Sequence, residues 1–266
     1  MNMFLHELKA YRKSTFIWTC SLIWVVLLFL AMFPAMSKDA ADFKKMLDNY
    51  SPGLVKALGF SFDSLFSLLG FYSSVTLMYV LLCGSIQAMN LGTSIISKEV
   101  RDKTADFLLT KPVSRVQIMT AKLCAVITSL VITNVFFIVA ASLMASAVQT
   151  EAYDYKIFLM VSLPLFFVQL MFMSLGIIIS VLVPKIRSVL PISLGTVFGF
   201  FILSMLSSSN GDSASRYITP FQYFDSSYII KNSAYEASYF IVALLFIVLT
   251  ITASYIIYSK KDIHSV

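Results

Sequence analysis

Histidine is nearly absent from this chain, and its scarcity argues against several kinds of catalytic or metal site. The 266 residues contain two histidines, His6 and His264, which both lie near the ends of the chain. A histidine-bound metal or a Ser–His catalytic pair deep in the fold is therefore implausible. None of the nine glycines is followed by lysine, so the phosphate-binding loop GxxxxGK(S/T) is also absent. The chain does not bind ATP by that route.

Charged residues are also few. They make up 13% of the sequence, against about 25% in an ordinary soluble domain, while hydrophobic residues make up 58%. This composition indicates an integral membrane protein. The three cysteines, Cys20, Cys83 and Cys124, form neither a disulfide framework nor a metal motif, and we interpret them as inert small hydrophobes.

Six long runs carry no charge at all. Each can supply the roughly 20 apolar residues with which a helix crosses about 30 Å of hydrocarbon, whereas the alternating pattern of barrel strands is absent. The sequence therefore predicts an all-α integral membrane protein with a single transmembrane domain over residues 1–266. We predict its spans at about 15–36, 66–92, 122–148, 157–183, 189–209 and 237–258.

The distribution of lysine and arginine predicts the orientation. When the six spans alternate in direction, 13 of the 20 basic residues fall on the side of the N-terminus and 7 on the other side. Basic residues gather on the cytoplasmic side, so we predict a cytoplasmic-membrane protein with both termini in the cytoplasm. The net charge of +6 follows mostly from this topology and does not imply a nucleic-acid partner.

Two segments outside the spans are predicted to be helices at the membrane surface. Residues 2–13 have their apolar side chains on one side, which suits an N-terminal interfacial helix, and an unstructured basic leader is the alternative. Before the last span, a proline introduces an aromatic cluster that predicts an external re-entrant or interfacial helix. The residues that define the two segments are Phe4, Leu8 and Tyr11 in the first and Pro220, Phe221, Tyr223 and Phe224 in the second.

The polar side chains at the centres of the predicted spans are uncharged, which argues against a proton relay or a voltage sensor. Gln87 and Asn90 lie three residues apart on one face of the second span, while Asn134 lies in the third and Gln169 in the fourth. We favour hydrogen bonds between helices for these residues. Contact with a translocated substrate is the alternative.

A charged segment, residues 98–122, lies between two of the longest uncharged runs. It must work in water while its flanks lie in lipid. On a helix over about 95–109, three carboxylates form an acidic stripe that faces solvent or meets basic residues of another protein. Pro112 ends this helix, and Ser114 is predicted to N-cap the next one. The stripe consists of Glu99, Asp102 and Asp106.

The same segment has an ordered set of residues that is familiar from one family. The set comprises Glu99, Thr104, Phe107, Leu108, Leu109, Pro112, Val113, Ser114, Arg115, Ile118 and Lys122. It resembles the segment between the second and third spans of ABC transporter permeases of the type-2 exporter class, although Lys103 stands where that family usually has glycine. The run Thr219 to Phe224 is similar to the family's Pro-Phe-x-Tyr-Phe element, and residues 260–263 resemble its basic-acidic tail. The resemblance covers essentially the whole chain.

This resemblance implies the permease subunit of an ATP-driven exporter, which moves substrate across the cytoplasmic membrane and is not itself an enzyme. Its partners would be two ABC ATP-binding subunits, a second permease copy or homologue, and the lipid bilayer. The chain would bind no cofactor, because ATP and Mg²⁺ lie on the partner subunit. Residues at about 96–118 would form the cytoplasmic coupling helix and its flanks. By carry-over, the residues that contact the ATPase are Lys98, Glu99, Val100, Arg101, Asp102, Asp106, Phe107, Pro112 and Arg115.

The alternative function is a secondary transporter or a channel-like membrane protein without an ATPase partner. The lack of charges within the spans and of internal repeats disfavours it. Peptides, lipids, drugs and ions remain open as substrates, as do homodimeric and heterodimeric pairing. Within the fifth span, Gly195 and Gly199 have the GxxxG spacing and are a candidate dimer face.

Overall fold

The computed structural model describes residues 3–48, 67–101, 113–183, 186–210 and 215–260, with only the backbone described at 38–48, 99–101, 208–210 and 215. All elements in these ranges are helical. The α-helices are α1 (Met3–Asp48), α4 (Leu68–Phe71), α5 (Leu77–Arg101), α7 (Arg115–Val148), α8 (Tyr155–Ser162), α9 (Pro164–Leu182), α10 (Val189–Asn210), α11 (Ser226–Asn232) and α12 (Ala237–Lys260). The remaining elements are the π-helix η1 (Tyr72–Thr76) and the 3-10 helices η2 (Ser215–Ile218) and η3 (Pro220–Gln222).

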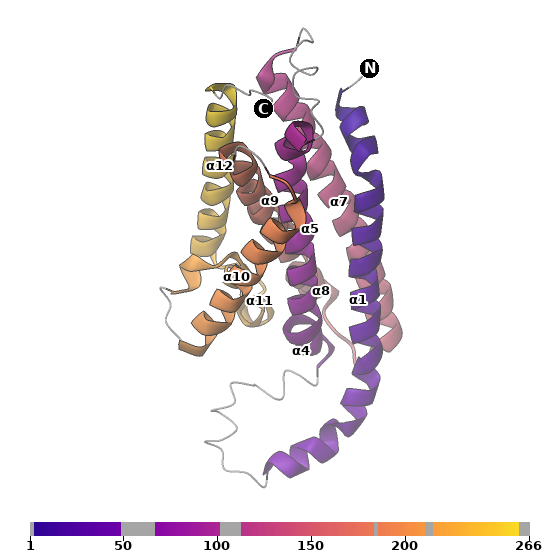
Figure 1. The fold of residues 1–266 in the computed structure, drawn as a ribbon. Helices are drawn as coiled ribbons and strands as arrows, with labels where there is room; N and C mark the ends of the chain where they lie inside the picture. The colour runs from indigo at the N-terminus through magenta and orange to yellow at the C-terminus, as the bar shows by residue number, and fades with distance from the viewer. Residues whose placement is uncertain (1–2, 49–66, 102–112, 184–185, 211–214, 261–266) are drawn as a thin grey trace.

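Six helical segments are long and apolar enough to cross a membrane, as the sequence predicts. They stand side by side in one bundle (Figure 1). The first turn of α1 and the last turn of α12 lie at the same end, which we call the terminal end, and the other is the opposite end. The six segments are Met3–Ser37, Leu68–Lys98, Arg115–Val148, Tyr155–Leu182, Val189–Ser207 and Ala237–Lys260.

The N-terminal leader is helical, but it forms the first turns of α1 instead of a separate interfacial helix. No glycine or proline interrupts residues 3–14, so nothing in the sequence turns the chain there. The inward face of the leader also continues into the span, since Tyr11, Leu22 and Val26 are all buried. The predicted turn between leader and first span is therefore absent.

At the centre of the bundle, α5 and α9 pack more extensively on each other than any other pair of the described helices. Two glycines allow this close approach. A Cβ atom added at Gly176 would lie 2.7 Å from both the Met89 carbonyl oxygen and the Thr93 amide nitrogen. At Gly92, a Cβ atom would overlap the carbonyl oxygen of Met173. The two backbones touch directly, as small residues permit in membrane helices.

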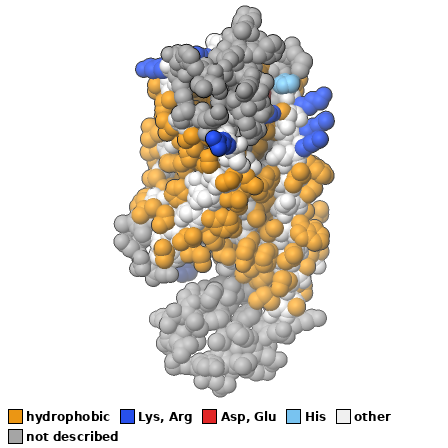
Figure 2. Space-filling view, in the orientation of Figure 1, with side chains coloured by type: hydrophobic (Ala, Val, Ile, Leu, Met, Phe, Trp, Pro, Cys, Tyr) orange, Lys and Arg blue, Asp and Glu red, His pale blue; other side chains and the backbone are white. Residues whose placement is uncertain are grey.

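The other spans surround this central pair. α1 packs mainly on α7, α12 on α9, and α10 on α5. The rings of Phe29 and Tyr79 stack 4.6 Å apart and join α1 to α5. Large apolar side chains on α10 and α12 remain exposed, and Figure 2 shows hydrophobic side chains over the body of the bundle and basic ones towards its ends. Such a surface suits contact with lipid.

The segment before the last span differs from the single helix that the sequence predicts. It consists of η2, η3 and the short helix α11. Pro220 begins η3, where its missing amide hydrogen costs nothing, and Asp225 caps a new helix by accepting a hydrogen bond from the Ser227 amide at 2.8 Å. Ser233 ends α11 in the left-handed conformation with φ of 50°. These caps and breaks explain why the segment is divided.

Candidate functional site

A chain of hydrogen bonds crosses the interior of the bundle. Gln87 Nε2 on α5 donates to Thr133 Oγ1 on α7 at 2.9 Å, and the Thr19 hydroxyl on α1 lies 3.0 Å from the same oxygen. Because the single hydroxyl proton of Thr133 is directed at the Ser129 carbonyl, 3.1 Å away, Thr133 accepts from both neighbours. Gln87, Thr133 and Thr19 are all buried. Three helices are thus joined at one hydroxyl group.

Gln169 on α9 extends this chain to a fourth helix. Its Nε2 lies 3.3 Å from Gln87 Oε1 and 3.4 Å from the Gly84 carbonyl oxygen, to which it donates. Its Oε1 accepts a hydrogen bond from Asn134 Nδ2 at 2.5 Å, and the same nitrogen donates to the Leu130 carbonyl at 2.8 Å. The structure therefore brings together three residues that the sequence places on three different spans. We call Thr19, Gln87, Thr133, Asn134 and Gln169 the polar network.

Asn90 lies outside the polar network. Its side chain is half-buried, and it makes no side-chain hydrogen bond within the part of the chain that the structure describes. No member of the network is ionisable near neutral pH, so it can hold helices in register but cannot relay protons. Across the described ranges, no group of three or more His, Cys, Asp or Glu side chains is placed to hold a metal ion.

Replacement of Gln169 by leucine should destabilise the bundle. The change removes three hydrogen bonds and leaves buried polar groups on Gln87 and Asn134 with fewer partners. Hydrogen bonds between membrane helices average about 0.6 kcal/mol, and stranded partners add to this, so we expect a loss of about 1–2 kcal/mol. Thermal unfolding of the purified chain in detergent measures the change.

The matched control for this experiment is Asn90→Leu. It removes a similar amide from the same face of α5 but breaks no hydrogen bond among the described residues, so we expect a change within about 0.5 kcal/mol. Equal destabilisation by both variants would contradict a structural role for the network. Unchanged stability with altered transport in Gln169→Leu would favour contact with the substrate.

A buried ion pair lies nearer the terminal end. Lys122 on α7 is 1% exposed, and its Nζ lies 3.3 Å from Glu7 Oε1 on α1, whose side chain is 10% exposed. The same ammonium group donates to the Ile95 carbonyl oxygen on α5 at 2.9 Å. A buried charge is costly unless it is paired and hydrogen-bonded. Glu7 on α1 and the Ile95 carbonyl on α5 meet this requirement for Lys122. We call Glu7, Lys122 and the Ile95 carbonyl the ion-pair clamp.

Neither charged member of the clamp is predicted as a site residue from the sequence, but a signal for Glu7 exists. It lies three residues after Phe4 and four before Tyr11, so helical periodicity places it on the apolar side of the leader. A carboxylate in that position needs a cationic partner. Lys122 is the last charged residue before the uncharged run that ends at Thr150. Sequence spacing does not show that the two meet.

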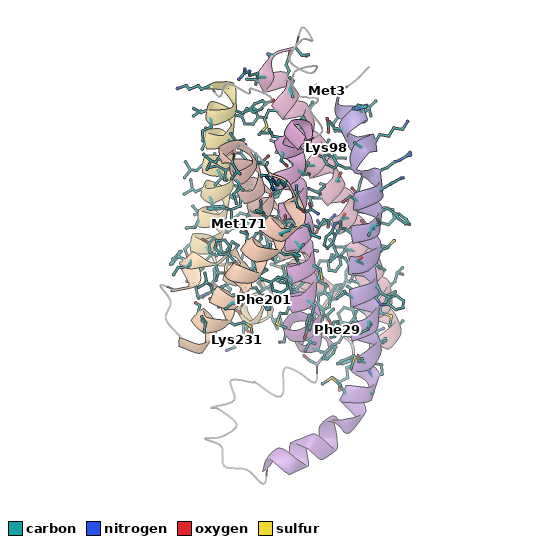
Figure 3. The ribbon with its side chains drawn as sticks, in the orientation of Figure 1. Met3, Phe29, Lys98, Met171, Phe201 and Lys231 are labelled. Atoms are coloured by element: carbon teal, nitrogen blue, oxygen red, sulfur yellow. The ribbon has the colours of Figure 1, made fainter. Side chains whose placement is uncertain are left out.

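The predicted coupling segment is described only at its edges. Lys98, on the last turns of α5, is half-buried, and its Nζ lies 5.7 Å from the centre of the Tyr11 ring on α1. Figure 3 shows Lys98 near the first turns of α1. The backbones of Glu99, Val100 and Arg101 continue α5 as a helix. The predicted contact residues outside the described ranges are Asp102, Asp106, Phe107 and Pro112.

At the far edge of this segment, α7 begins with a capping box. Ser114 Oγ accepts a hydrogen bond from the Gln117 amide at 3.2 Å, and Gln117 Oε1 accepts from the Ser114 amide at 3.0 Å. The prediction that Ser114 caps this helix is confirmed. Arg115, the first residue of α7, extends to α12, where its Nη1 lies 3.5 Å from the Tyr258 carbonyl oxygen.

A groove of about 580 Å³ opens towards the opposite end, between η1, α5, α10 and the segment before α12. Its walls combine apolar side chains such as Leu81 and Phe201 with five serines. Arg216 lines it as well, held by Glu236 at 3.2 Å and lying 4.3 Å from the centre of the Tyr239 ring. This lining can accommodate a molecule with both apolar and hydrogen-bonding groups. The serines are Ser73, Ser74, Ser204, Ser207 and Ser226.

The aromatic segment before α12 packs into the bundle. Pro220, Tyr223 and Phe224 are buried, and the Phe221 ring lies 5.2 Å from that of Phe172 on α9. The Tyr223 hydroxyl donates to the Tyr217 carbonyl at 2.8 Å. Burial, together with the nearby Tyr217 phenol, raises the pKa of Tyr223, so this hydroxyl stays protonated and can donate at neutral pH. Phe221 and Phe224 also line the groove, so this segment forms one of its walls.

The two glycines of the candidate dimer face lie in open space. Apart from the adjacent backbone of α10 itself, a Cβ atom added at Gly195 or Gly199 would have no atom of the described residues within 4 Å. This face of α10 is therefore free of contacts within the described parts of the chain. It contrasts with Gly92 and Gly176, which are packed against a neighbouring backbone.

The chain was compared with known proteins. A family model described as ABC-2 family transporter protein matches residues 1–263. No curated protein matches the chain. The match spans all six apolar helices and the segments that join them.

Proposed function

Because this chain belongs to the ABC-2 transporter family and is therefore a multi-pass permease component of an ABC transporter, we propose that it works in an ATP-driven exporter of the cytoplasmic membrane. Two separate ATP-binding subunits supply the energy, and they, not this chain, carry ATP and Mg²⁺. A second permease copy or homologue completes the assembly through the α10 face that bears Gly195 and Gly199. Both termini lie in the cytoplasm, which follows from the distribution of basic residues.

The contacts at the edges of the coupling segment support this proposal most directly. The segment joins α5 to α7, Lys98 contacts α1 through Tyr11, and Arg115 contacts α12 through the Tyr258 carbonyl. A displacement of the segment by an ATPase would therefore act on four helices at once. Rigid packed elements of this kind can transmit a ligand-driven population shift.

We place the cargo-binding site in the groove, towards the opposite end of the bundle. Its serine hydroxyls and Arg216 can bind polar groups, while Phe201 and Leu81 contact apolar ones. We assign it to an amphipathic substrate on this ground. The polar network is buried among α1, α5, α7 and α9, and it shares α5 with the groove.

Charge reversal at the coupling segment tests the proposal. Glu99→Lys combined with Asp102→Lys places cations on the surface that is proposed to meet the ATPase. We expect normal membrane insertion but loss of most of the ATPase that co-purifies with the tagged chain, because juxtaposed like charges at an interface cost several kcal/mol. Co-purification in mild detergent and ATP-dependent transport in vesicles are the two measurements.

Glu151→Lys is the control, since this exposed carboxylate lies in the turn between α7 and α8 at the opposite end. It should leave both co-purification and transport intact. An unchanged yield of ATPase in the coupling-segment variant would rule out the assigned docking residues. A chain that transports without any co-purifying ATPase would instead establish the secondary transporter or channel.

A further inference from the structure

The outer face of the first turns of α1 carries three basic residues, Lys9, Arg12 and Lys13. All three are exposed, and their spacing of three and four residues makes them neighbours on one helix face. No carboxylate lies within ion-pair distance of any of them in the part of the chain that the structure describes. Figure 2 shows blue side chains projecting from the bundle where the first turns of α1 lie. We call these three residues the basic face.

The ion-pair clamp explains why this face has only positive charge. Glu7 is the sole carboxylate among residues 3–37, and it could neutralise a neighbouring cation on the same helix. Instead, its side chain points inward and pairs with Lys122 at 3.3 Å. The fold therefore removes the acidic residue from the surface of the leader.

Below the basic face, the same side of α1 becomes apolar without a break. Phe16 is 70% exposed, Ile17 62% and Trp24 67%, so none of the described helices covers this side in these turns. A large exposed apolar stripe on a membrane span faces the hydrocarbon of lipids. The basic face lies immediately above this stripe, so a bilayer whose hydrocarbon surrounds the stripe would place its headgroups at the level of the basic face.

We propose that the basic face binds the headgroups of anionic phospholipids, whose acyl chains lie along the stripe formed by Phe16, Ile17 and Trp24. Two features define the ligand: a negative headgroup that lies opposite three exposed cations, and hydrocarbon that lies opposite the exposed apolar residues. A soluble protein partner would use the cations but would leave the adjoining stripe uncovered. The lipid fits both parts of the surface, and this site does not depend on the proposed export function.

Lipid titration of the purified full-length chain tests the proposal. In detergent, dioleoylphosphatidylglycerol should raise the Tm more than dioleoylphosphatidylcholine does. In the variant Lys9→Gln/Arg12→Gln/Lys13→Gln, we expect the difference between the two lipids to fall by about half or more. It should also shrink in the wild-type chain when salt rises from about 0.1 M to 1 M, because the Debye length falls from about 10 Å to 3 Å.

The variant Lys156→Gln/Lys231→Gln is the matched control, because both residues are exposed cations, Lys156 in the first turn of α8 and Lys231 at the opposite end (Figure 3). It should keep the full difference between the two lipids. An identical lipid response in the triple variant and the wild-type chain would overturn the proposal. If the triple variant keeps its lipid response but loses a co-purifying ATPase, the basic face binds protein and the proposal fails.

Folding of the variants is checked by their Tm in dioleoylphosphatidylcholine alone. Should the triple variant fail to fold, Lys9→Gln, Arg12→Gln and Lys13→Gln are measured singly. A reduced response to the anionic lipid in these variants supports the site. A full response in all three overturns it.

Discussion

Replacement of Gly92 by alanine is expected to disrupt the central pair of helices. The new Cβ atom would overlap the carbonyl oxygen of Met173, which belongs to the backbone of α9 and cannot rotate away. Alanine favours a helix over glycine by up to about 1 kcal/mol, but overpacking of a tight core costs about 1–3 kcal/mol, and more when backbone must move. The net effect is destabilising, and we expect a lower Tm and a loss of monodisperse protein in size-exclusion chromatography.

The chain offers its own control for this experiment. In the monomeric chain, Gly195→Ala introduces the same methyl group into space on α10 that no neighbouring element fills, so helix propensity alone acts and the stability of the monomer should be equal or higher. Gly176→Ala should resemble Gly92→Ala, since its Cβ would lie 2.7 Å from backbone atoms of α5. A Gly92→Ala chain as stable as Gly195→Ala would show that α5 and α9 do not touch as described.

Loss of the ammonium group at residue 122 should be the most damaging change near the terminal end. In Lys122→Met, the apolar volume of the side chain is nearly retained, but Glu7 loses its partner and the Ile95 carbonyl loses a donor. Removing one member of a buried ion pair costs about 3–5 kcal/mol, because the other charge stays buried without compensation. Thermal unfolding in detergent should show a Tm well below that of the wild-type chain.

The double variant Glu7→Gln/Lys122→Met distinguishes the contribution of the whole ion pair from the cost of leaving one charge unpaired. It leaves no unpaired charge, and replacement of a whole buried pair is often close to neutral, so most of the lost stability should return. Lys156→Met, at an exposed cation, serves as the control and should have little effect. If the double variant is as unstable as Lys122→Met, the damage comes from packing and not from the stranded carboxylate.

Local signals in the sequence were sufficient for the spans and for one helix cap. Charge-free runs predict the six apolar helices because burial in lipid excludes charge from a span. Ser114 is predicted as a cap because its chemistry acts within three residues, on Gln117. The family, too, follows from an ordered pattern within the segment 98–122 and agrees with the matched family model.

Contacts between distant parts of the chain are harder to predict. Gln87, Asn134 and Gln169 stand out as polar residues, but only the packing of three helices determines that they meet and that Asn90 does not. The partners in the ion-pair clamp are 115 residues apart, and helical periodicity points to Glu7 without identifying Lys122. The leader differs from its predicted form for a related reason, since amphipathic periodicity does not distinguish a surface helix from the start of a long span.

The length of α1 has a mechanical consequence. Its 46 residues have a contour length of about 69 Å, more than twice the roughly 30 Å of a hydrocarbon layer, and the helix bends in its C-terminal part (Figure 1). The helix is held at the terminal end by the ion-pair clamp, and its ladder of hydrogen bonds is interrupted by a proline only at Pro34. A tilt of about 5° at the clamp would move the backbone at Pro34, about 40 Å away along the helix, by about 3.5 Å, so this part of the helix can act as a lever across the bundle.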